Sequence, residues 1–318
     1  MDQFLSCDWG TSSFRLRLIN ANNLQVLAEI KENRGIMETF TAWQQRMPLT
    51  DRITFYGSVI MDQIRVLSER LHAPLAGVPV VLSGMASSSI GLLDLPYKVL
   101  PFKLDGSDLH IEVYKTDESA NPFIIVSGAQ TEDDVMRGEE TKLVGCAPYL
   151  IESESEQLLV LPGTHPKHVT IKDHQVIGFK TFMTGEFFDI LSTKSILSSS
   201  IESGGDFNHP SNRKSFMEAV ERSQTVNLLH NSFMVRTNQL LKQLPKQQNF
   251  FYLSGLLIGT ELAGLGSKKS IYLLGGSLHH SLYRAACSAL GIDIVQSLDA
   301  DLALVNGQAI IFSRFKQD

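Results

Sequence analysis

A short stretch near the N-terminus carries the residue types from which a phosphate-binding turn can be built. An apolar run ends in Asp8, and Gly10, Thr11 and Ser12 follow before an alternating segment resumes. Asp8 at the tip of a strand offers a hard oxygen ligand to Mg²⁺ or to its water shell. Gly10 lets backbone N–H groups approach phosphate oxygens, and the hydroxyls add donors. The same residues suit an ordinary hairpin turn equally well.

A second stretch repeats the order of the first. Another apolar strand is followed by Pro162, Gly163 and Thr164, and then by an alternating strand, a polar turn and a third strand. Pro162 stands where the first copy has Asp8 and Trp9, so we expect this copy to bind phosphate through its backbone and hydroxyl. Duplicated domains are then expected to face each other across a cleft and to hold a nucleotide's phosphates from both sides.

The elements around the first turn are those of an open α/β sheet. Three antiparallel strands are predicted over residues 4–30, a helix over residues 56–71, and then a strand that ends just before Ser83. Open α/β sheets bind ligands at the carboxyl ends of their strands, so the loop with Ser83, Gly84 and Met85 is a candidate contact for a polyol. A solvated serine-rich connection fits its composition as well.

A group of acids lies between the two copies. Thr131 with Asp134 three residues later resembles a capping box and predicts a helix start. Glu139 and Glu140 could supply the base that phosphoryl transfer needs near the attacking hydroxyl, or they could only favour a helix N-terminus through its dipole. Arg137 could clamp a substrate carboxylate or pair with Asp134.

The C-terminal half supplies a third glycine turn. An apolar strand ends in Gly275 and Gly276, and Ser277 is expected to cap a helix that runs to Leu290. Such a turn suits a nucleotide's α-phosphate or the packing of adenosine over the glycines, although αβ units often turn on glycines without a ligand. Residues 301–314 are predicted to form a last helix, which could return to the first domain.

Length and charge restrict the class of protein. The chain has 318 residues, a formal net charge of −6 at pH 7, and 3 cysteines without CxxC spacing. The length predicts two domains, residues 1–137 and 138–318, with a small β insertion near residues 92–121. No cluster of Lys and Arg suggests a nucleic-acid partner, and every apolar run is too short to cross a bilayer. We therefore expect a cytoplasmic protein with free thiols.

The three glycine turns resemble the two phosphate loops and the adenosine loop of the actin, Hsp70 and sugar-kinase superfamily. More specifically, Val135-Met-Arg-Gly-Glu-Glu-Thr141, Leu161-Pro-Gly-Thr-His165, Met183–Glu186 and Leu253–Gly259 resemble the 2-dehydro-3-deoxygalactonokinase family, in the expected order over nearly the whole chain. The resemblance implies two ribonuclease-H-like domains with a nucleotide cleft between them. It also implies a kinase that uses ATP and Mg²⁺ to phosphorylate the 6-hydroxyl of 2-dehydro-3-deoxy-D-galactonate.

The resemblance also assigns roles to residues. The first domain would bind the sugar acid and the second the nucleotide. Related sugar kinases take their base from an acid that opens the helix before the second phosphate turn, which ranks Glu139 before Glu140 and Asp134. The expected site comprises catalytic Glu139, Glu140 and Asp8; phosphate-binding Gly10, Thr11, Ser12, Gly163 and Thr164; adenosine-binding Gly275, Gly276 and Ser277; substrate-binding Ser83, Gly84, Met85 and Arg137; and Asp8 for the metal.

Other functions stay open at this point. An ATP-dependent switch of the same superfamily would keep the nucleotide and lack the sugar acceptor. A kinase for another small sugar acid would differ through the 92–121 insertion, and a phosphatase acting on polyphosphate would release phosphate without ATP. The oligomeric state, a homodimer included, also stays open.

Overall fold

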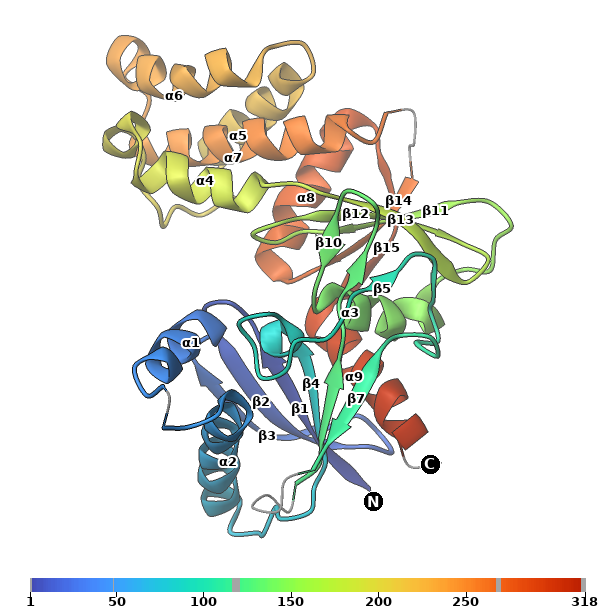
Figure 1. Cartoon of the computed structure of the whole chain (residues 1–318). Coiled ribbons are helices and arrows are strands. Elements are labelled where there is room, and N and C mark those ends of the chain that lie inside the picture. Colours follow the sequence, from blue (N-terminus) through green and yellow to red (C-terminus); the bar gives the residue numbers. More distant parts are fainter. Residues whose placement is uncertain (1, 48, 116–120, 267–269, 316–318) are drawn as a thin grey trace. The chain divides into compact units, whose positions relative to one another are not determined.

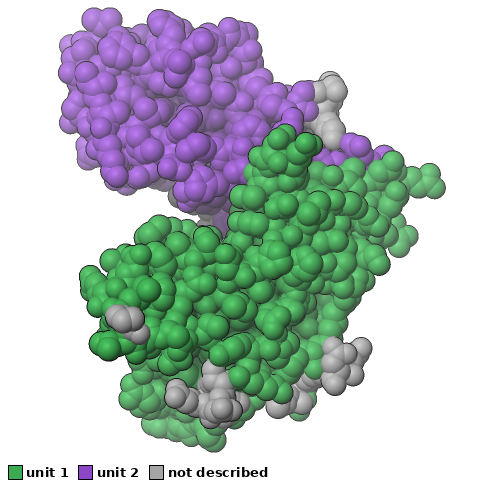
Figure 2. Space-filling model, in the orientation of Figure 1, with its two compact units in different colours: residues 1–154, 172–178, 300–318 green, residues 155–171, 179–299 purple. Residues whose placement is uncertain are grey.

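The polypeptide forms two compact units, each built on a mixed β-sheet. The structure is a computed structural model that describes residues 2–47, 49–115, 121–266 and 270–315 (Figure 1). Unit 1 consists of residues 1–154, 172–178 and 300–318, and unit 2 of residues 155–171 and 179–299 (Figure 2). This division differs from the predicted boundary at residues 137/138, because the helix that follows residue 138 packs within unit 1.

The sheet of unit 1 has the strand order β3-β2-β1-β4-β8-β7. Strands β1, β2 and β3 form an antiparallel meander, β4 and β8 continue parallel to β1, and β7 is antiparallel to β8. Residues 80–82 of β4 are fully buried, as expected of a central strand covered on both faces. The strands are β1 (Gln3–Trp9), β2 (Phe14–Asn20), β3 (Val26–Glu32), β4 (Val80–Gly84), β7 (Ile111–Tyr114) and β8 (Phe123–Val126).

The sheet of unit 2 repeats this topology. Its order is β15-β14-β11-β12-β13, so that β11 lies between β12 and β14 as β1 lies between β2 and β4 in unit 1, and β15 lies beside β14 as β8 lies beside β4. Strand β14 is parallel to β11, and β15 is parallel to β14. The predicted internal repeat is therefore confirmed. The strands are β11 (Gln157–Leu161), β12 (Lys167–Lys172), β13 (Gln175–Thr181), β14 (Ser270–Gly275) and β15 (Asp293–Asp299).

Helices accompany both sheets. Unit 1 contains α1 (Ile36–Gln44) and α2 (Arg52–Leu71), and Asp51 caps α2 by accepting the N–H of Thr54. Unit 2 contains α4 (Thr184–Thr193), α5 (Pro210–Ser223), α6 (Leu228–Lys242), α7 (Lys246–Ala263) and α8 (Ser277–Leu290). Helix α7 is buried almost all round, as its apolar sequence predicts, and Gly255 lets it approach α5 closely: a Cβ there would lie 2.3 Å from the carbonyl oxygen of Phe216.

Helices α3 (Glu139–Cys146) and α9 (Ala300–Phe315) cross at two glycines in unit 1. A Cβ on Gly145 would lie 1.7 Å from the carbonyl oxygen of Ala303, and one on Gly307 would lie 1.9 Å from that of Thr141. The amide of Gln308 is within hydrogen-bond distance of carbonyl oxygens of β1 and β4. These contacts place α3, like the last helix, in unit 1.

The segment after β4 is β-rich, as predicted for the insertion. It contains β5 (Lys98–Val99), β6 (Phe102–Lys103) and β7, and β5 joins a small sheet with β9 (Ala129–Gln130) and β10 (Val135–Met136). The helix start predicted at Thr131 is wrong. The N–H of Thr131 donates to the carbonyl oxygen of Asp134 at 2.9 Å and closes the β9–β10 turn. Helix α3 begins only after Gly138, whose φ of +99° redirects the chain.

The described helices include none with the length and hydropathy of a membrane-spanning segment.

The α3–α9 crossing gives a stability test. Because the Cβ of Gly145→Ala would overlap a backbone carbonyl, the helices must separate, and we expect the free energy of unfolding to fall by about 2 kcal/mol or more. Thermal and urea unfolding measure the loss. Gly178→Ala is the control, since no atom lies within 4 Å of its Cβ position. Equal stability of the two variants would contradict the close crossing.

Candidate active site

Several expected residues meet at the carboxyl ends of β1 and β4 in unit 1. Asp8 pairs in register with Ser83. A Cβ on Gly84 would lie 3.5 Å from Oδ1 of Asp8 and 2.8 Å from the carbonyl oxygen of Trp9, and one on Gly138 would lie 3.0 Å from Cα of Gly84. Three segments distant in sequence therefore touch through their backbones, and the half-buried carboxylate of Asp8 lies among them.

The turn after Asp8 is fixed through its carbonyl groups. The N–H of Gly10 donates to the carbonyl oxygen of Ser13 at 2.9 Å, which closes the turn. The carbonyl oxygens of Gly10 and Thr11 accept from the first N–H groups of α1 at 3.0 and 3.2 Å. The side chains of Thr11 and Ser12 are exposed, so their hydroxyls can reach a ligand.

The two acids that open α3 have different surroundings. Glu140 is fully buried, and its carboxylate accepts the N–H of Gly138 at 2.6 Å and the hydroxyl of Thr141 at 3.0 Å. Burial, together with the nearby charge of Glu139, raises the pKa of Glu140 to about 7. Glu139 is only partly buried, and its Oε2 accepts the N–H of Arg137 at 3.1 Å. Of the two carboxylates, Glu139 is the one that solvent can reach.

Arg137 is held against the loop that follows β4. Its Nη1 donates to both the carbonyl oxygen and the hydroxyl of Ser87, the latter at 2.8 Å. Its guanidinium carbon lies 4.1 Å from the ring centroid of Tyr97, and its Nε is buried without a hydrogen-bond partner among the described residues. The guanidinium of Arg137 is thus fixed in place on the loop after β4.

The loop after β4 is placed as expected, but one of its side chains is occupied. Gly84 has a φ of +85° and leads into the short 3₁₀ helix η1 (Met85–Ser87), where Met85 is half-buried. Ser83 is fully buried, and its hydroxyl accepts from Nε2 of Gln308 at 2.7 Å. Sequence reasoning missed Gln308, although a buried amide in the apolar run of the last helix is a signal that could have been used.

In unit 2, the second glycine turn packs on the start of α4. A Cβ on Gly185 would lie 2.6 Å from the carbonyl oxygen of Gly163, and the N–H of Glu186 donates to the carbonyl oxygen of Thr164 at 3.1 Å. The carboxylate of Glu186 also lies 2.6 Å from Nε2 of His165. These contacts leave Thr164 exposed at the tip of the turn.

The third glycine turn lies beside the second. A Cβ on Gly275 would lie 3.5 Å from the ring of Pro162. The prediction that Ser277 caps α8 is wrong: Gly276 is the N-cap residue in an extended conformation, and Ser277 is the first helical residue. The expected phosphate turn and adenosine turn are therefore neighbours in unit 2.

An apolar cavity of about 330 Å³ adjoins the second turn in unit 2. Its lining includes Gly163, Tyr283 of α8 and an aromatic group formed by Phe188, Phe207, Phe250 and Phe251. The phenylalanine rings contact one another at centroid distances of 4.9 to 5.6 Å. Its volume and apolar wall suit one heteroaromatic ring system.

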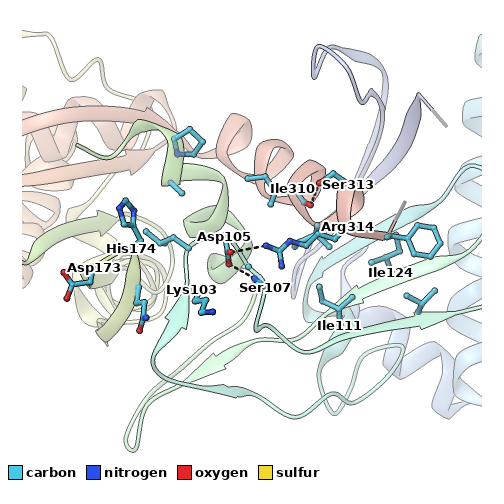
Figure 3. A pocket seen from close by; sticks show the side chains of 18 residues that line it. Lys103, Asp105, Ser107, Ile111, Ile124, Asp173, His174, Ile310, Ser313 and Arg314 are labelled. Atoms are coloured by element: carbon cyan, nitrogen blue, oxygen red, sulfur yellow. Dashed lines mark hydrogen bonds and ion pairs between the residues drawn. The ribbon is translucent and has the colours of Figure 1, made fainter. Parts of the chain in front are cut away.

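A larger open pocket of about 1080 Å³ lies elsewhere in unit 1 (Figure 3). Its polar side chains come from the loop after β6, the β12–β13 turn and α9, and Arg314 pairs with Asp105 at 3.3 Å across it. None of the expected site residues lines this pocket. The candidate site is therefore placed at β1, β4 and α3 in unit 1 and at the two turns in unit 2.

No group of three or more His, Cys, Asp or Glu side chains among the described residues is arranged to hold a metal ion. This does not conflict with the role expected of Asp8, because Mg²⁺ commonly uses one or two carboxylates and completes its shell with phosphate oxygens and water.

Comparison with known proteins gives consistent matches. A family model described as 2-keto-3-deoxy-galactonokinase matches residues 8–311. A Rhizobium meliloti protein named as a probable 2-dehydro-3-deoxygalactonokinase is 32% identical over 96% of this chain and 94% of its own length. The 2-dehydro-3-deoxygalactonokinase of Escherichia coli is 34% identical over 68% of this chain and 72% of its own length.

Solved structures agree with these sequence matches. A Sinorhizobium meliloti structure described as a 2-dehydro-3-deoxygalactonokinase protein has a TM-score of 0.81 at 32% identity, and covers 98% of this chain and 96% of that one. The activator of a 2-hydroxyisocaproyl-CoA dehydratase from Clostridium difficile has a TM-score of 0.51 at 11% identity, with 99% and 96% covered, and shows only a shared fold. The fold is that of the actin-like ATPases, with two ribonuclease-H-like units.

The buried carboxyl of Glu140 predicts a pH-dependent stability. Its pKa rises from 4.5 in the unfolded chain to about 7 in the fold. The folded protein therefore keeps a proton that the unfolded chain releases between these values, and stability falls as pH rises through this window, by about 3 kcal/mol in total. Urea unfolding of the native protein and of Glu140→Gln from pH 4 to 8 measures the difference.

We expect Glu140→Gln to lack this component of the pH profile. Its amide can still accept the N–H of Gly138. Glu112→Gln, at an exposed position of β7, is the control and should keep the wild-type profile. Parallel profiles for the native protein and Glu140→Gln would show that the carboxyl titrates normally.

Proposed function

Because this chain belongs to the 2-keto-3-deoxy-galactonokinase family, we propose that it transfers the γ-phosphoryl group of ATP to the 6-hydroxyl of 2-dehydro-3-deoxy-D-galactonate. The observation that carries the proposal is the family match over residues 8–311. The chain is a carbohydrate kinase by family, and a small sugar acid is its acceptor. Its use of ATP would place the reaction in the cytoplasm, and a homodimer stays a prediction.

Unit 2 is proposed to bind the nucleotide. Gly163 and Thr164 would contact phosphate oxygens through backbone and hydroxyl, while Gly275, Gly276 and Ser277 would contact the adenosine. Two observations support this assignment: the turn containing Gly275 packs on Pro162, and Gly163 lines the aromatic cavity. The cavity would take the purine ring, and the turn beside it would take the phosphates.

Unit 1 is proposed to bind the sugar acid beside Asp8. Arg137 would bind the substrate carboxylate, since its half-buried side chain carries a guanidinium that Ser87 and Tyr97 hold beside the loop after β4. The backbone of Gly84 and the side chain of Met85 would line the same site. Ser83, expected to bind the substrate, is instead proposed to support the loop, because its hydroxyl is buried on Gln308.

Asp8 and the turn after it are proposed to serve the phosphates and the metal. Thr11 and Ser12 would donate to phosphate oxygens from an exposed turn whose carbonyl groups are already bonded. Gly10, whose N–H is bonded to Ser13, would instead let the backbone come close to the phosphates. The half-buried carboxylate of Asp8 fits a ligand of Mg²⁺ or of its water shell. Bound Mg²⁺ would neutralise charge on the transferring phosphoryl group.

Glu139 is proposed as the general base. It opens α3 next to Arg137, and solvent reaches its carboxylate, whereas both oxygens of Glu140 are engaged inside the protein. A base must be within hydrogen-bond reach of the hydroxyl that it deprotonates, which favours the accessible acid. The raised pKa of Glu140 would keep that neighbour partly protonated near neutral pH, so that it adds less negative charge beside Glu139.

The proposed reaction is tested by coupled ADP-release assays with a panel of sugar acids. We expect turnover with 2-dehydro-3-deoxy-D-galactonate, and a product that carries phosphate at the 6-position by ³¹P and ¹H NMR. Gluconate, galactonate and the epimeric 2-dehydro-3-deoxygluconate are the comparison substrates. ATP turnover that does not respond to any sugar acid would indicate the ATP-dependent switch, and phosphate release from polyphosphate without ATP would indicate the phosphatase.

The base is tested by Glu139→Gln. We expect kcat to fall by about 10²- to 10⁴-fold while the Kd for ATP stays unchanged, because the amide cannot accept the hydroxyl proton. Glu132→Gln, an exposed acid of the preceding turn, is the control and should keep wild-type turnover. Near-normal turnover of Glu139→Gln would move the role to Glu140 or Asp134.

A further inference from the structure

Unit 2 contains a buried polar cluster that the proposed reaction does not use directly. Glu261 of α7 accepts a hydrogen bond from the hydroxyl of Tyr283 of α8 at 2.7 Å, and its other carboxylate oxygen lies 3.0 Å from Nε2 of His168 of β12. The side chains of Glu261 and His168 are only 1% and 5% exposed. One carboxylate thus joins a strand and two helices.

The carboxyl group of Glu261 holds the cluster together through hydrogen-bonding contacts inside the protein. Burial, and then the charge of Glu261, raise the pKa of Tyr283, so its hydroxyl stays protonated and donates. The same two causes raise the pKa of Cys287, one turn further along α8, to about 12. A buried carboxylate is costly unless its oxygens are bonded, so each partner is held firmly in position.

The elements joined by Glu261 lead to the proposed nucleotide site. Strand β12 follows the turn of Gly163 and Thr164, and α8 follows the turn of Gly275 and Gly276. The ring of Tyr283 lines the aromatic cavity, while its hydroxyl points to Glu261. The ring of His168 packs on Phe182, with centroids 4.3 Å apart, just before α4 begins.

We propose that Glu261 is a positioning residue for the nucleotide: by bonding Tyr283 and His168 at once, it fixes the wall of the aromatic cavity relative to the phosphate turn, so that a purine fits between them. The inference rests on the proposed nucleotide site in unit 2 and adds to it a residue that does not touch the nucleotide.

A cluster that served stability alone would have no need of a charge. Replacing a buried ionic group with well-packed apolar side chains is often neutral or stabilising, whereas a bonded carboxylate specifies one arrangement of its partners. The hydroxyl of Tyr283 is the point at which this arrangement reaches the cavity. Its removal leaves one oxygen of Glu261 without this donor, so we expect it to change the shape of the cavity and also to lower the stability of the fold.

The test uses Tyr283→Phe, which keeps the ring and removes only the hydroxyl. We expect the Kd for adenosine, measured by isothermal titration calorimetry, to rise about tenfold. This change in binding free energy is about the size of one hydrogen bond to a charged group. The Kd for inorganic tripolyphosphate should stay within about twofold, because the phosphate turn keeps its contacts with α4. In the kinase assay the KM for ATP should rise while kcat stays within about twofold.

Two further variants sharpen the test. Glu261→Gln keeps the size of the side chain and one acceptor, and should weaken adenosine binding in the same direction. Tyr272→Phe is the matched control: this tyrosine of β14 is also buried, and its hydroxyl accepts from Gln157 instead of contacting the cavity cluster. It should leave the Kd for adenosine unchanged.

The outcomes separate the two proposals. The positioning role would be overturned if Tyr283→Phe bound adenosine as tightly as the native protein, or if its affinity fell equally for adenosine and tripolyphosphate. A native protein that binds no nucleotide would also overturn it. If the native protein transfers no phosphoryl group to a sugar acid and Tyr283→Phe still weakens adenosine selectively, the positioning role stands and the proposed function fails.

Discussion

Close approach of backbone to backbone is the constraint on which both halves of the candidate site depend. In unit 1, Gly84 packs on the end of β1 and Gly138 packs on Gly84, which places the first residues of α3 beside Asp8. In unit 2, Gly185 packs on the turn of Gly163 and Thr164. Any Cβ at these positions would meet main-chain atoms that cannot rotate away, so the acids and hydroxyls around them have little freedom.

Each unit adds a buried carboxylate to this glycine framework. Glu140 accepts hydrogen bonds from neighbouring residues, the N–H of Gly138 and the hydroxyl of Thr141. Its burial raises its pKa. Glu261 is satisfied at a distance, by side chains from a strand and another helix. The first arrangement fixes one helix start, and the second fixes the relation between three elements. A buried carboxyl group can thus serve either local or long-range order, depending on where its partners lie.

The duplicated topology lets similar elements take different roles. Both turns join the first and second strands of their sheets, but only the first carries a carboxylate: Asp8 lies two residues before Gly10, whereas the residue two before Gly163 is Leu161 and not, as expected, Pro162. This asymmetry supports the proposal that unit 1 binds the metal and the sugar acid while unit 2 binds the nucleotide. In unit 2 the ring of Pro162, which stands where unit 1 has Trp9, packs on Gly275 and so supports the neighbouring turn.

The sequence by itself determined the strand–turn–strand repeat, the glycine turns, the buried α7 and the family motifs, because these depend on local periodicity and on residue types close together in the chain. It misplaced the start of α3 at Thr131, because a local capping pattern cannot show that β9 and β10 pair instead. Only the tertiary structure decided that Glu140 is buried while Glu139 is accessible, that Ser83 is bonded to Gln308, and that Glu261 joins His168 to Tyr283. Burial and hydrogen bonding between residues 22 to 225 positions apart follow from how helices and strands pack, and a linear pattern does not encode that packing.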